Sequence, residues 1–219
     1  MCPAGVIRLA ALLFMLLGTW VIIQTYFDRS WRPRSTTGTQ APRHECGNRK
    51  GCPRDHFAFR LISGAANVVG PSICFNDQIL MSNVRNNIGR GLNIALVNGG
   101  LQSRPRGSAT RQPCPESPGD IKELETFLTE IKSGTVVLTA TFDDPATKMT
   151  DTVRTLFTEL GSSFVSNLGF RDNWVFLGAK GLNAKSPFEE HIKNNKETNK
   201  YDGWPELLEL EGCAPRKVD

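Results

Sequence analysis

Four cysteines offer the clearest chemistry in the sequence, because they frame the part of the chain that should fold. Cys46 and Cys52 lie close together, Cys74 follows, and Cys213 lies near the C-terminus. The first two are spaced more widely than a zinc-binding pair, and none of the three histidines pairs with them. All four follow an apolar leader that would carry the chain into an oxidising compartment, where thiols form disulfides. We therefore predict two disulfides, and spacing alone leaves their pairing open.

No arrangement of residues in the sequence indicates an enzyme. The adjacent carboxylates of Asp143-Asp144 do not supply the separated acid and base that hydrolysis of a glycosidic bond requires. A cysteine nucleophile is disfavoured because an oxidising compartment converts thiols into disulfides. The histidines have no partners that would make them catalytic; they are His44, His56 and His191. We therefore expect a non-enzymatic protein with no cofactor and no bound metal.

The composition fits a single domain that follows a leader. The chain has 219 residues, a formal net charge of +4 and a pI near 8.8. After a leader and a linker are subtracted, about 170 residues remain, which is enough for one domain with a hydrophobic core. Lysines and arginines are mixed with acidic residues along the chain, so no basic stripe indicates a nucleic-acid partner.

An uninterrupted apolar stretch, Leu9–Ile23, dominates the N-terminus. Its length of about 15 residues suits a signal peptide and is short for a membrane span. Counting on to Phe27 gives about 19 uncharged residues, so an uncleaved signal anchor stays an alternative. We favour a cleaved signal peptide at residues 1–27, followed by a disordered linker at 28–45 that is rich in Ser, Thr, Pro and Arg.

Residue periodicity predicts alternating strands and helices after the linker. Strands are expected at His56–Ile62, Leu92–Val97, Thr135–Thr141 and Trp174–Gly178. Helices are expected to begin at three capping positions, which are Asp120, Thr150 or Asp151, and Ser186. The order of these elements indicates an α/β fold in which helices cover a mixed sheet.

Several long motifs carry a resemblance that covers nearly the whole chain from Cys46. They read SGAANVVGPSIC, NNIGRGLNIALVNG, DDPATKMTD, LGFRDNWVFLGAKG and KSPFEEHIKNNKETNKYDGWPELLELEGC. In these motifs the chain resembles the secreted, cytokine-like family of interleukin-like EMT inducer and pancreatic-derived factor. The resemblance implies a compact ββα sandwich over residues 46–215, with a tail at 216–219. It also implies the disulfides Cys46–Cys74 and Cys52–Cys213.

Two features depart from the pattern of that family. After Asn98-Gly99 the family continues into a hairpin strand and an aromatic segment, whereas here residues 100–115 are polar and rich in proline. Such a stretch cannot supply an ordinary interior strand. Leu177 stands where one family member has a cysteine for covalent dimerisation, and Cys114 is left as the odd thiol. We therefore expect a monomer.

The same domain type resembles the lectin-like stem of the O-mannose N-acetylglucosaminyltransferase. This resemblance implies that a carbohydrate is bound by Arg90 of the GRG motif, Asp143 of the acidic turn and Arg171 of the RDNW motif. We add Trp174 as an aromatic neighbour of that site. An arginine held by a glycine turn can donate paired hydrogen bonds to sugar hydroxyls or to a carboxylate.

Each candidate also has a purely structural interpretation. Arg90 fits a tight turn in which its guanidinium is solvated or pairs with Asp77. The tandem aspartates fit a turn that is closed by hydrogen bonds to backbone amides. Arg171 fits an ion pair with Asp172, and Trp174 fits a place in the core. The sequence alone leaves these alternatives open.

Together these features predict a protein that is secreted through the ER and Golgi and acts outside the cell. Its expected partners are a cell-surface receptor, a glycan, or both, and no nucleic acid. The alternative is a membrane-anchored lumenal accessory domain that binds glycans in the secretory pathway. That alternative requires an uncleaved leader, because only then would the protein contact a membrane.

Overall fold

The computed structural model describes residues 14–24, 44–98, 108–111 and 118–216, and the chain divides into two units, Met1–Ala41 and Pro42–Asp219. In the first unit, residues 14–24 form a helix. Across the described ranges, no helix combines the length and the apolar character that crossing a membrane requires. The signal peptide at 1–27 and the linker at 28–45 stay predictions.

The second unit is built on two sheets. The four-stranded sheet has the order β3-β2-β1-β9 and comprises β1 (His56–Ile62), β2 (Ser72–Phe75), β3 (Gln78–Met81) and β9 (Glu209–Pro215). The five-stranded sheet has the order β5-β4-β6-β7-β8 and comprises β4 (Gly91–Asn98), β5 (Ser108–Arg111), β6 (Thr135–Phe142), β7 (Asn173–Ala179) and β8 (Phe188–Ile192). The described strand pairs are antiparallel, so two antiparallel sheets replace the expected mixed sheet.

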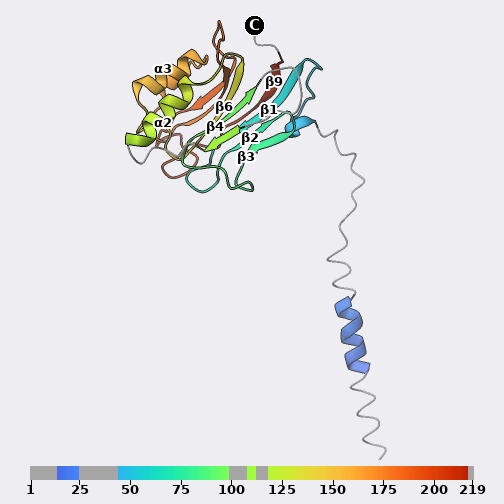
Figure 1. Ribbon diagram of the computed structural model, residues 1–219. Coiled ribbons are helices and arrows are strands. Elements are labelled where there is room, and N and C mark those ends of the chain that lie inside the picture. Colours follow the sequence, from blue (N-terminus) through green and yellow to red (C-terminus); the bar gives the residue numbers. More distant parts are fainter. Residues whose placement is uncertain (1–13, 25–43, 99–107, 112–117, 217–219) are drawn as a thin grey trace, which may run out of the picture. The chain divides into compact units, whose positions relative to one another are not determined.

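The sheets pack face to face, and helices cover the outer face of the five-stranded sheet (Figure 1). Because side chains alternate along a strand, β6 contributes to two cores. Val136 and Leu138 pack toward the four-stranded sheet, whereas Val137 packs toward helices α2 (Pro118–Thr129) and α3 (Asp151–Glu159). Strand β7 is likewise buried on both faces. The predicted ββα sandwich is confirmed.

Helix α3 begins where its capping chemistry predicts. The Thr150 hydroxyl accepts a hydrogen bond from the Val153 amide over 3.2 Å, and it donates to Glu125 Oε1 of α2 over 2.7 Å. Val153 and Phe157 then bury one face of the helix. A short 3₁₀ helix, η2 (Val165–Asn167), follows. Helix α2 begins at Pro118, ahead of the cap expected at Asp120.

The third predicted helix is wrong, because the chain after Ser186 forms strand β8. The Ser186 hydroxyl does accept from a nearby amide, that of Phe188, over 3.1 Å. Glu189, however, does not return to the cap as a capping box requires. Its carboxylate instead accepts from Trp174 Nε1 over 2.8 Å and from the Ser163 amide over 2.6 Å. Pairing with β7 and these distant hydrogen bonds override the local helix signal.

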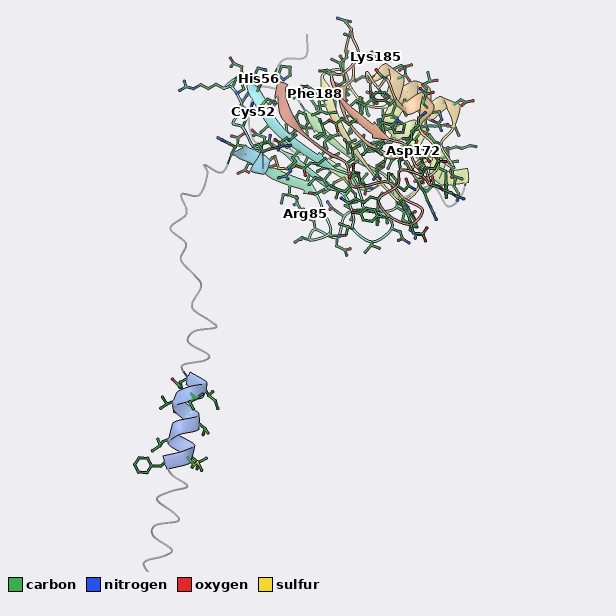
Figure 2. The ribbon with its side chains drawn as sticks, turned by 180° about the vertical axis from the view of Figure 1, so that it is seen from behind. Cys52, His56, Arg85, Asp172, Lys185 and Phe188 are labelled. Carbon is green, nitrogen blue, oxygen red and sulfur yellow. A yellow bond between two sulfur atoms is a disulfide. The ribbon has the colours of Figure 1, made fainter. Side chains whose placement is uncertain are left out.

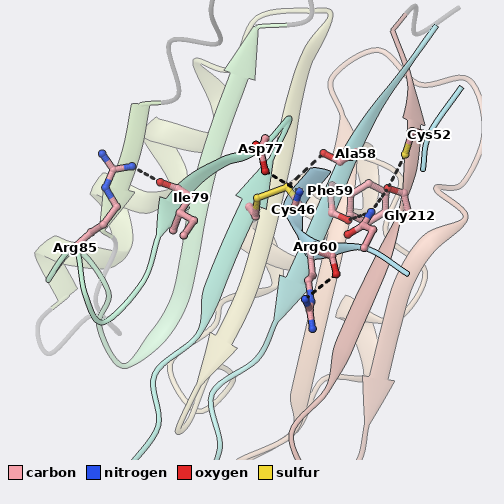
Figure 3. Close-up of a disulfide and its surroundings, with 12 residues drawn as sticks. Cys46, Cys52, Ala58, Phe59, Arg60, Asp77, Ile79, Arg85 and Gly212 are labelled. Carbon is pink, nitrogen blue, oxygen red and sulfur yellow. Dashed lines mark hydrogen bonds between the residues drawn. A yellow bond between two sulfur atoms is a disulfide. The ribbon is translucent and has the colours of Figure 1, made fainter. Parts of the chain in front are cut away.

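Two disulfides fasten the start of the domain to the four-stranded sheet, and Figure 3 shows the one at Cys46. Cys46–Cys74 joins the 3₁₀ helix η1 (Glu45–Gly47) to β2, and Cys52–Cys213 joins the segment before β1 to β9. Asn48 adds a polar connection, since its side-chain amide donates to the carbonyls of Phe59 and Gly212, each over 3.3 Å. Both pairings match those that the family resemblance implies.

The region that departs from the family pattern supplies an edge strand. Strand β5 pairs with β4 at the edge of the five-stranded sheet, which fits the prediction that this proline-rich region forms no interior strand. Leu177 is 5% exposed and packs in the core between the two sheets. Cys114 lies outside the described residues.

Candidate functional site

The three polar motifs meet at one end of the five-stranded sheet. The register pairs Gly91, the first residue of β4, with Phe142, the last residue of β6. Strand β7 begins beside this end of β6, where the Trp174 amide donates to Thr141 Oγ1 over 2.8 Å. We use the name sheet-end site for the residues that flank these strand ends: Arg90, Asp143 and Arg171.

Arg90 and Asp143 form an ion pair across this end of the sheet. Arg90 Nε lies 2.9 Å from Asp143 Oδ2, and the exposed fractions of the two side chains are 64% and 12%. The alternative in which Arg90 pairs with Asp77 is wrong, because Arg90 pairs with Asp143, and Asp77 accepts a hydrogen bond from the Cys46 amide over 3.1 Å. The pair therefore presents an accessible guanidinium whose position is set by a largely covered carboxylate.

The tandem aspartates differ in role: Asp144 closes the turn, and Asp143 pairs with Arg90. Asp144 Oδ1 accepts from the amides of Ala146 and Thr147 over 3.1 and 3.2 Å, which is the turn chemistry expected for it. Asp143 has a φ of 62°, a left-handed conformation that is uncommon outside glycine. Such conformations persist where the surrounding structure holds them, often at ligand sites. The turn thus leaves the Asp143 carboxylate directed to Arg90.

Arg171 also has a left-handed backbone, with a φ of 59°. Its Cζ lies 4.7 Å from the centre of the Phe170 ring and 3.8 Å from that of Trp204, at cation–π distance. The interpretation of Arg171 as the ion-pair partner of Asp172 is wrong, since Asp172 pairs elsewhere. Trp204 was not among the residues predicted for the site, because no local signal connects a residue so distant in the chain to Arg171.

Trp174 lies in the core rather than at the surface. Its side chain is 0% exposed, stacks on Phe176 with 5.4 Å between ring centres, and meets Phe157 edge-on at 5.3 Å. The ring faces the helices, and its Nε1 donates to Glu189. A side chain so enclosed cannot contact a ligand at the surface, so we leave Trp174 out of the sheet-end site.

A buried Asp172–His191 pair supports the loop that carries Arg171. His191 Nε2 lies 2.7 Å from Asp172 Oδ2, and the two side chains are 5% and 6% exposed. Figure 2 shows Asp172 well apart from His56 and Cys52, so neither of these residues belongs to the surroundings of the pair. The partner of His191 was not predicted, because His191 lies on β8, which was taken for a helix. In the described ranges, the side-chain hydrogen bond of the His191 ring is the one to Asp172.

Hydrogen bonds set the charge state of Asp172. Burial acts most strongly on its carboxyl group and would raise the pKa. The hydrogen bonds from His191, from the Asn194 amide and from the Gly169 amide, together with the attraction of His191, outweigh burial and lower the pKa of Asp172. Both carboxylate oxygens are therefore occupied by donors within the protein.

We expect the carboxylate of Asp172 to stabilise the fold at neutral pH and to lose this effect in acid. A pKa lowered by folding contributes stability that is complete above the unfolded value of about 3.9 and disappears as the pH falls through the lower folded value. Asp172→Asn should lower the free energy of unfolding by about 2 kcal/mol at neutral pH. Urea unfolding over a pH series measures the gap between the two proteins, which should shrink below about pH 3. A gap that stays constant into strong acid would contradict this account.

The sheet-end site has the chemistry of a recognition site for a polar ligand. Arg90 supplies N–H donors, and Asp143 supplies carboxylate oxygens that can accept from hydroxyl groups. Phe170, 55% exposed, and Tyr201, 40% exposed, add aromatic surface near Arg171 and Trp204. Among the described residues, no cluster of His, Cys, Asp and Glu could hold a metal ion. Adjacent hydroxyl groups would match the donors and acceptors of Arg90 and Asp143, and an apolar ring face would match the aromatic surface. Sugars have both features.

Comparisons with known proteins cover both this site and the whole chain. The family model described as Interleukin-like EMT inducer matches residues 90–182, which include all three residues of the sheet-end site. The chain is 53% identical to Protein FAM3D of Mus musculus, over 98% of both chains. It is 47% identical to Protein FAM3C of Homo sapiens, over 99% of both chains. Protein FAM3C of Danio rerio is 56% identical, over 86% of this chain and 82% of that protein.

Proposed function

This chain belongs to the cytokine-like FAM3 family of interleukin-like EMT inducer proteins, and we propose that it is a secreted, non-enzymatic protein that recognises a glycan through the sheet-end site. In this proposal the glycan belongs to a cell-surface receptor, and binding starts a signal. The protein acts as a monomer. The ligand is held by side chains and needs no cofactor.

The observation that carries the proposal is the meeting of three separate loops at one end of a rigid sheet. Each loop supplies a side chain suited to a hydroxyl-rich ligand, and the β4–β6 register fixes Arg90 beside Asp143. Binding residues on loops that a buried sheet positions are a common arrangement in recognition proteins. The left-handed backbone of Asp143 and Arg171 supports a functional rather than a packing role for these loops.

Secretion is supported by the two disulfides and by family membership. We expect protein recovered from the culture medium of producing cells to begin between about Thr25 and Glu45, because a signal peptidase would have removed the leader. N-terminal sequencing measures this directly. Protein that is retained in cells with its leader intact would instead favour a membrane-anchored form.

Glycan recognition is tested by an array of oligosaccharides probed with the purified protein and with Asp143→Asn. Asparagine tolerates the left-handed backbone and preserves the shape of the side chain, so the change removes the charge and one acceptor. We expect the signal for the bound glycan to fall roughly tenfold or more, because hydrogen bonds to a charged group contribute strongly. The thermal unfolding midpoint serves as the check on folding.

Glu130→Gln provides a matched control for that experiment. Glu130 is an exposed carboxylate just after α2, next to the opposite end of β6, and its loss of charge equals that of Asp143→Asn. We expect Glu130→Gln to bind as the wild-type protein does. Equal binding by all three proteins would remove the sheet-end site from the proposal, and no signal from any of them would remove glycan recognition itself.

A further inference from the structure

Arg171 is a half-buried cation with no anionic partner in the described part of the chain. Three described arginines are half-buried, and the other two reach oxygen atoms: Arg60 pairs with Glu209 at 2.8 Å, and Arg154 donates to the Leu168 carbonyl over 3.0 Å. Arg171 has contacts to two aromatic rings instead, and its Nε is buried without a hydrogen-bond partner. A cation partly removed from water is costly unless it is paired.

The carboxylates of Asp172 and Asp143 have partners other than Arg171. Asp172 Oδ2 accepts from His191 and the Gly169 amide, and Asp172 Oδ1 accepts from the Asn194 amide. Asp143 is paired with Arg90 at 2.9 Å. Both carboxylates therefore pair with other groups, and the guanidinium of Arg171 has no anionic partner among the described residues.

A second unpartnered donor lies against Arg171. The Nε1 atom of Trp204 is buried without a hydrogen-bond partner, and the ring of Trp204 lies 3.8 Å from Arg171 Cζ. Buried donors in native proteins are almost always paired, so two orphaned donors side by side require an explanation. The unpartnered groups beside Arg171 are both hydrogen-bond donors, which favours a ligand rich in acceptor oxygens.

The guanidinium is held in place rather than free to move to a partner. Phe170 and Trp204 contact it, and a Cβ atom at Gly203 would lie 3.0 Å from Arg171 Nη1. Gly203 therefore allows the backbone to approach the guanidinium closely. A planar guanidinium fixed in this way is suited to two parallel hydrogen bonds to a carboxylate or a sulfate.

We propose that the glycan bound at the sheet-end site is anionic, and that Arg171 binds its carboxylate or sulfate group. The inference rests on the proposed glycan recognition and adds the charge class of the ligand. Arg171 pairs with the acidic group, exposed Phe170 offers an apolar surface to the sugar ring, and Arg90 with Asp143 binds hydroxyls. A neutral sugar can contact Phe170 and the Arg90–Asp143 pair, but it leaves Arg171 without an anionic partner.

The test uses pairs of oligosaccharides that differ only in the acidic group. One pair is a sialylated oligosaccharide and its desialylated form, a second is a uronate-containing oligosaccharide and its carboxyl-reduced form, and a third is a sulfated oligosaccharide and its desulfated form. Calorimetry with the mature protein gives the affinity for each. In at least one pair the anionic member should bind roughly ten- to hundredfold more tightly than the neutral one. The pair that responds identifies the acidic group as carboxylate or sulfate.

Three variants assign the preference to Arg171. Arg171→Gln should remove the preference for the anionic member, and Arg171→Lys should keep part of it, because lysine retains the charge but not the paired donors. Arg216→Gln is the matched control, since Arg216 also lies over an aromatic ring, Phe57 at 4.5 Å, but follows β9 outside the sheet-end site. It should bind as the wild-type protein does. If Arg171→Gln fails to fold, the binding of each pair to the wild-type protein is measured again in high salt. Screening by salt should reduce the preference for the anionic member.

The outcomes separate this inference from the proposed function. If both members of every pair bind equally and Asp143→Asn weakens that binding, glycan recognition stands and the anionic class is overturned. A preference that Arg171→Gln leaves intact, or that high salt does not reduce, also overturns the role of Arg171. If no oligosaccharide binds, both the inference and the proposed glycan recognition fail.

Discussion

Replacing Cys52 and Cys213 together with serine should lower the free energy of unfolding by about 5 kcal/mol at most. Their disulfide joins positions separated by 161 residues, so it removes much of the conformational freedom that the unfolded chain would otherwise have. The stability of an entire domain is typically about 5–15 kcal/mol. The double variant is therefore expected to be marginally folded.

The second disulfide provides an internal comparison. Cys46 and Cys74 are separated by 28 residues, and the same relation gives at most about 3.5 kcal/mol for their bond. Chemical denaturation of both double variants, without reductant, measures the two losses. We expect the Cys52–Cys213 variant to lose about 1.5 kcal/mol more. An equal or smaller loss would contradict the view that closure of the long loop stabilises the domain.

Trp174→Ala should lower the free energy of unfolding by about 3–5 kcal/mol, the usual cost of truncating a buried aromatic ring. The ring is 0% exposed between Phe157 and Phe176, so its loss opens a cavity beneath the helices. The change also removes the hydrogen bond that the Trp174 indole donates to the Glu189 carboxylate. That carboxylate also accepts from the Ser163 amide. Thermal or urea unfolding measures the effect.

The milder variant Trp174→Phe separates packing from ligand contact. It keeps most of the ring volume, so the protein should fold, with a smaller loss of stability that reflects the missing donor to Glu189. Its affinity for a glycan should equal that of the wild-type protein, because the ring is enclosed by the core. A large loss of affinity in a fully folded Trp174→Phe protein would return Trp174 to the candidate site.

The elements that could be predicted from the sequence are those with strong local signals. The β-branched run from Thr135 predicts β6, which is observed at Thr135–Phe142. The Thr150 hydroxyl predicts the start of α3, and its hydrogen bond to the Val153 amide has the expected form. In both cases the information lies within a few residues, so no knowledge of distant contacts is needed.

Strand β8 could not be predicted in this way, because its conformation depends on distant residues. Ser186 and Glu189 have the types and spacing of a helix start, yet the Glu189 carboxylate is bound by Trp174 and Ser163 from other elements. The error had a further consequence. With β8 taken for a helix, the register that places His191 opposite Trp174 was missing, and so was the Asp172–His191 pair.

The resemblance supplied the residues of the candidate site but not their contacts. Arg90, Asp143 and Arg171 were found by resemblance of their motifs, and the structure places all three at one end of the five-stranded sheet. Their partners depend on the register and on loops far along the chain. The contact of Arg171 with Trp204, for example, joins residues that no periodic pattern relates.

Mapping of backbone amide shifts by NMR would show whether a glycan binds where these three loops meet. A bound oligosaccharide titrated into ¹⁵N-labelled protein should shift the amides of residues 88–91, 143–147, 169–172 and 201–204. Amides on the outer face of the four-stranded sheet, such as those of Arg60 and Ile79, should stay unchanged. Shifts confined to that outer face, with none at the sheet-end site, would show that the glycan binds elsewhere.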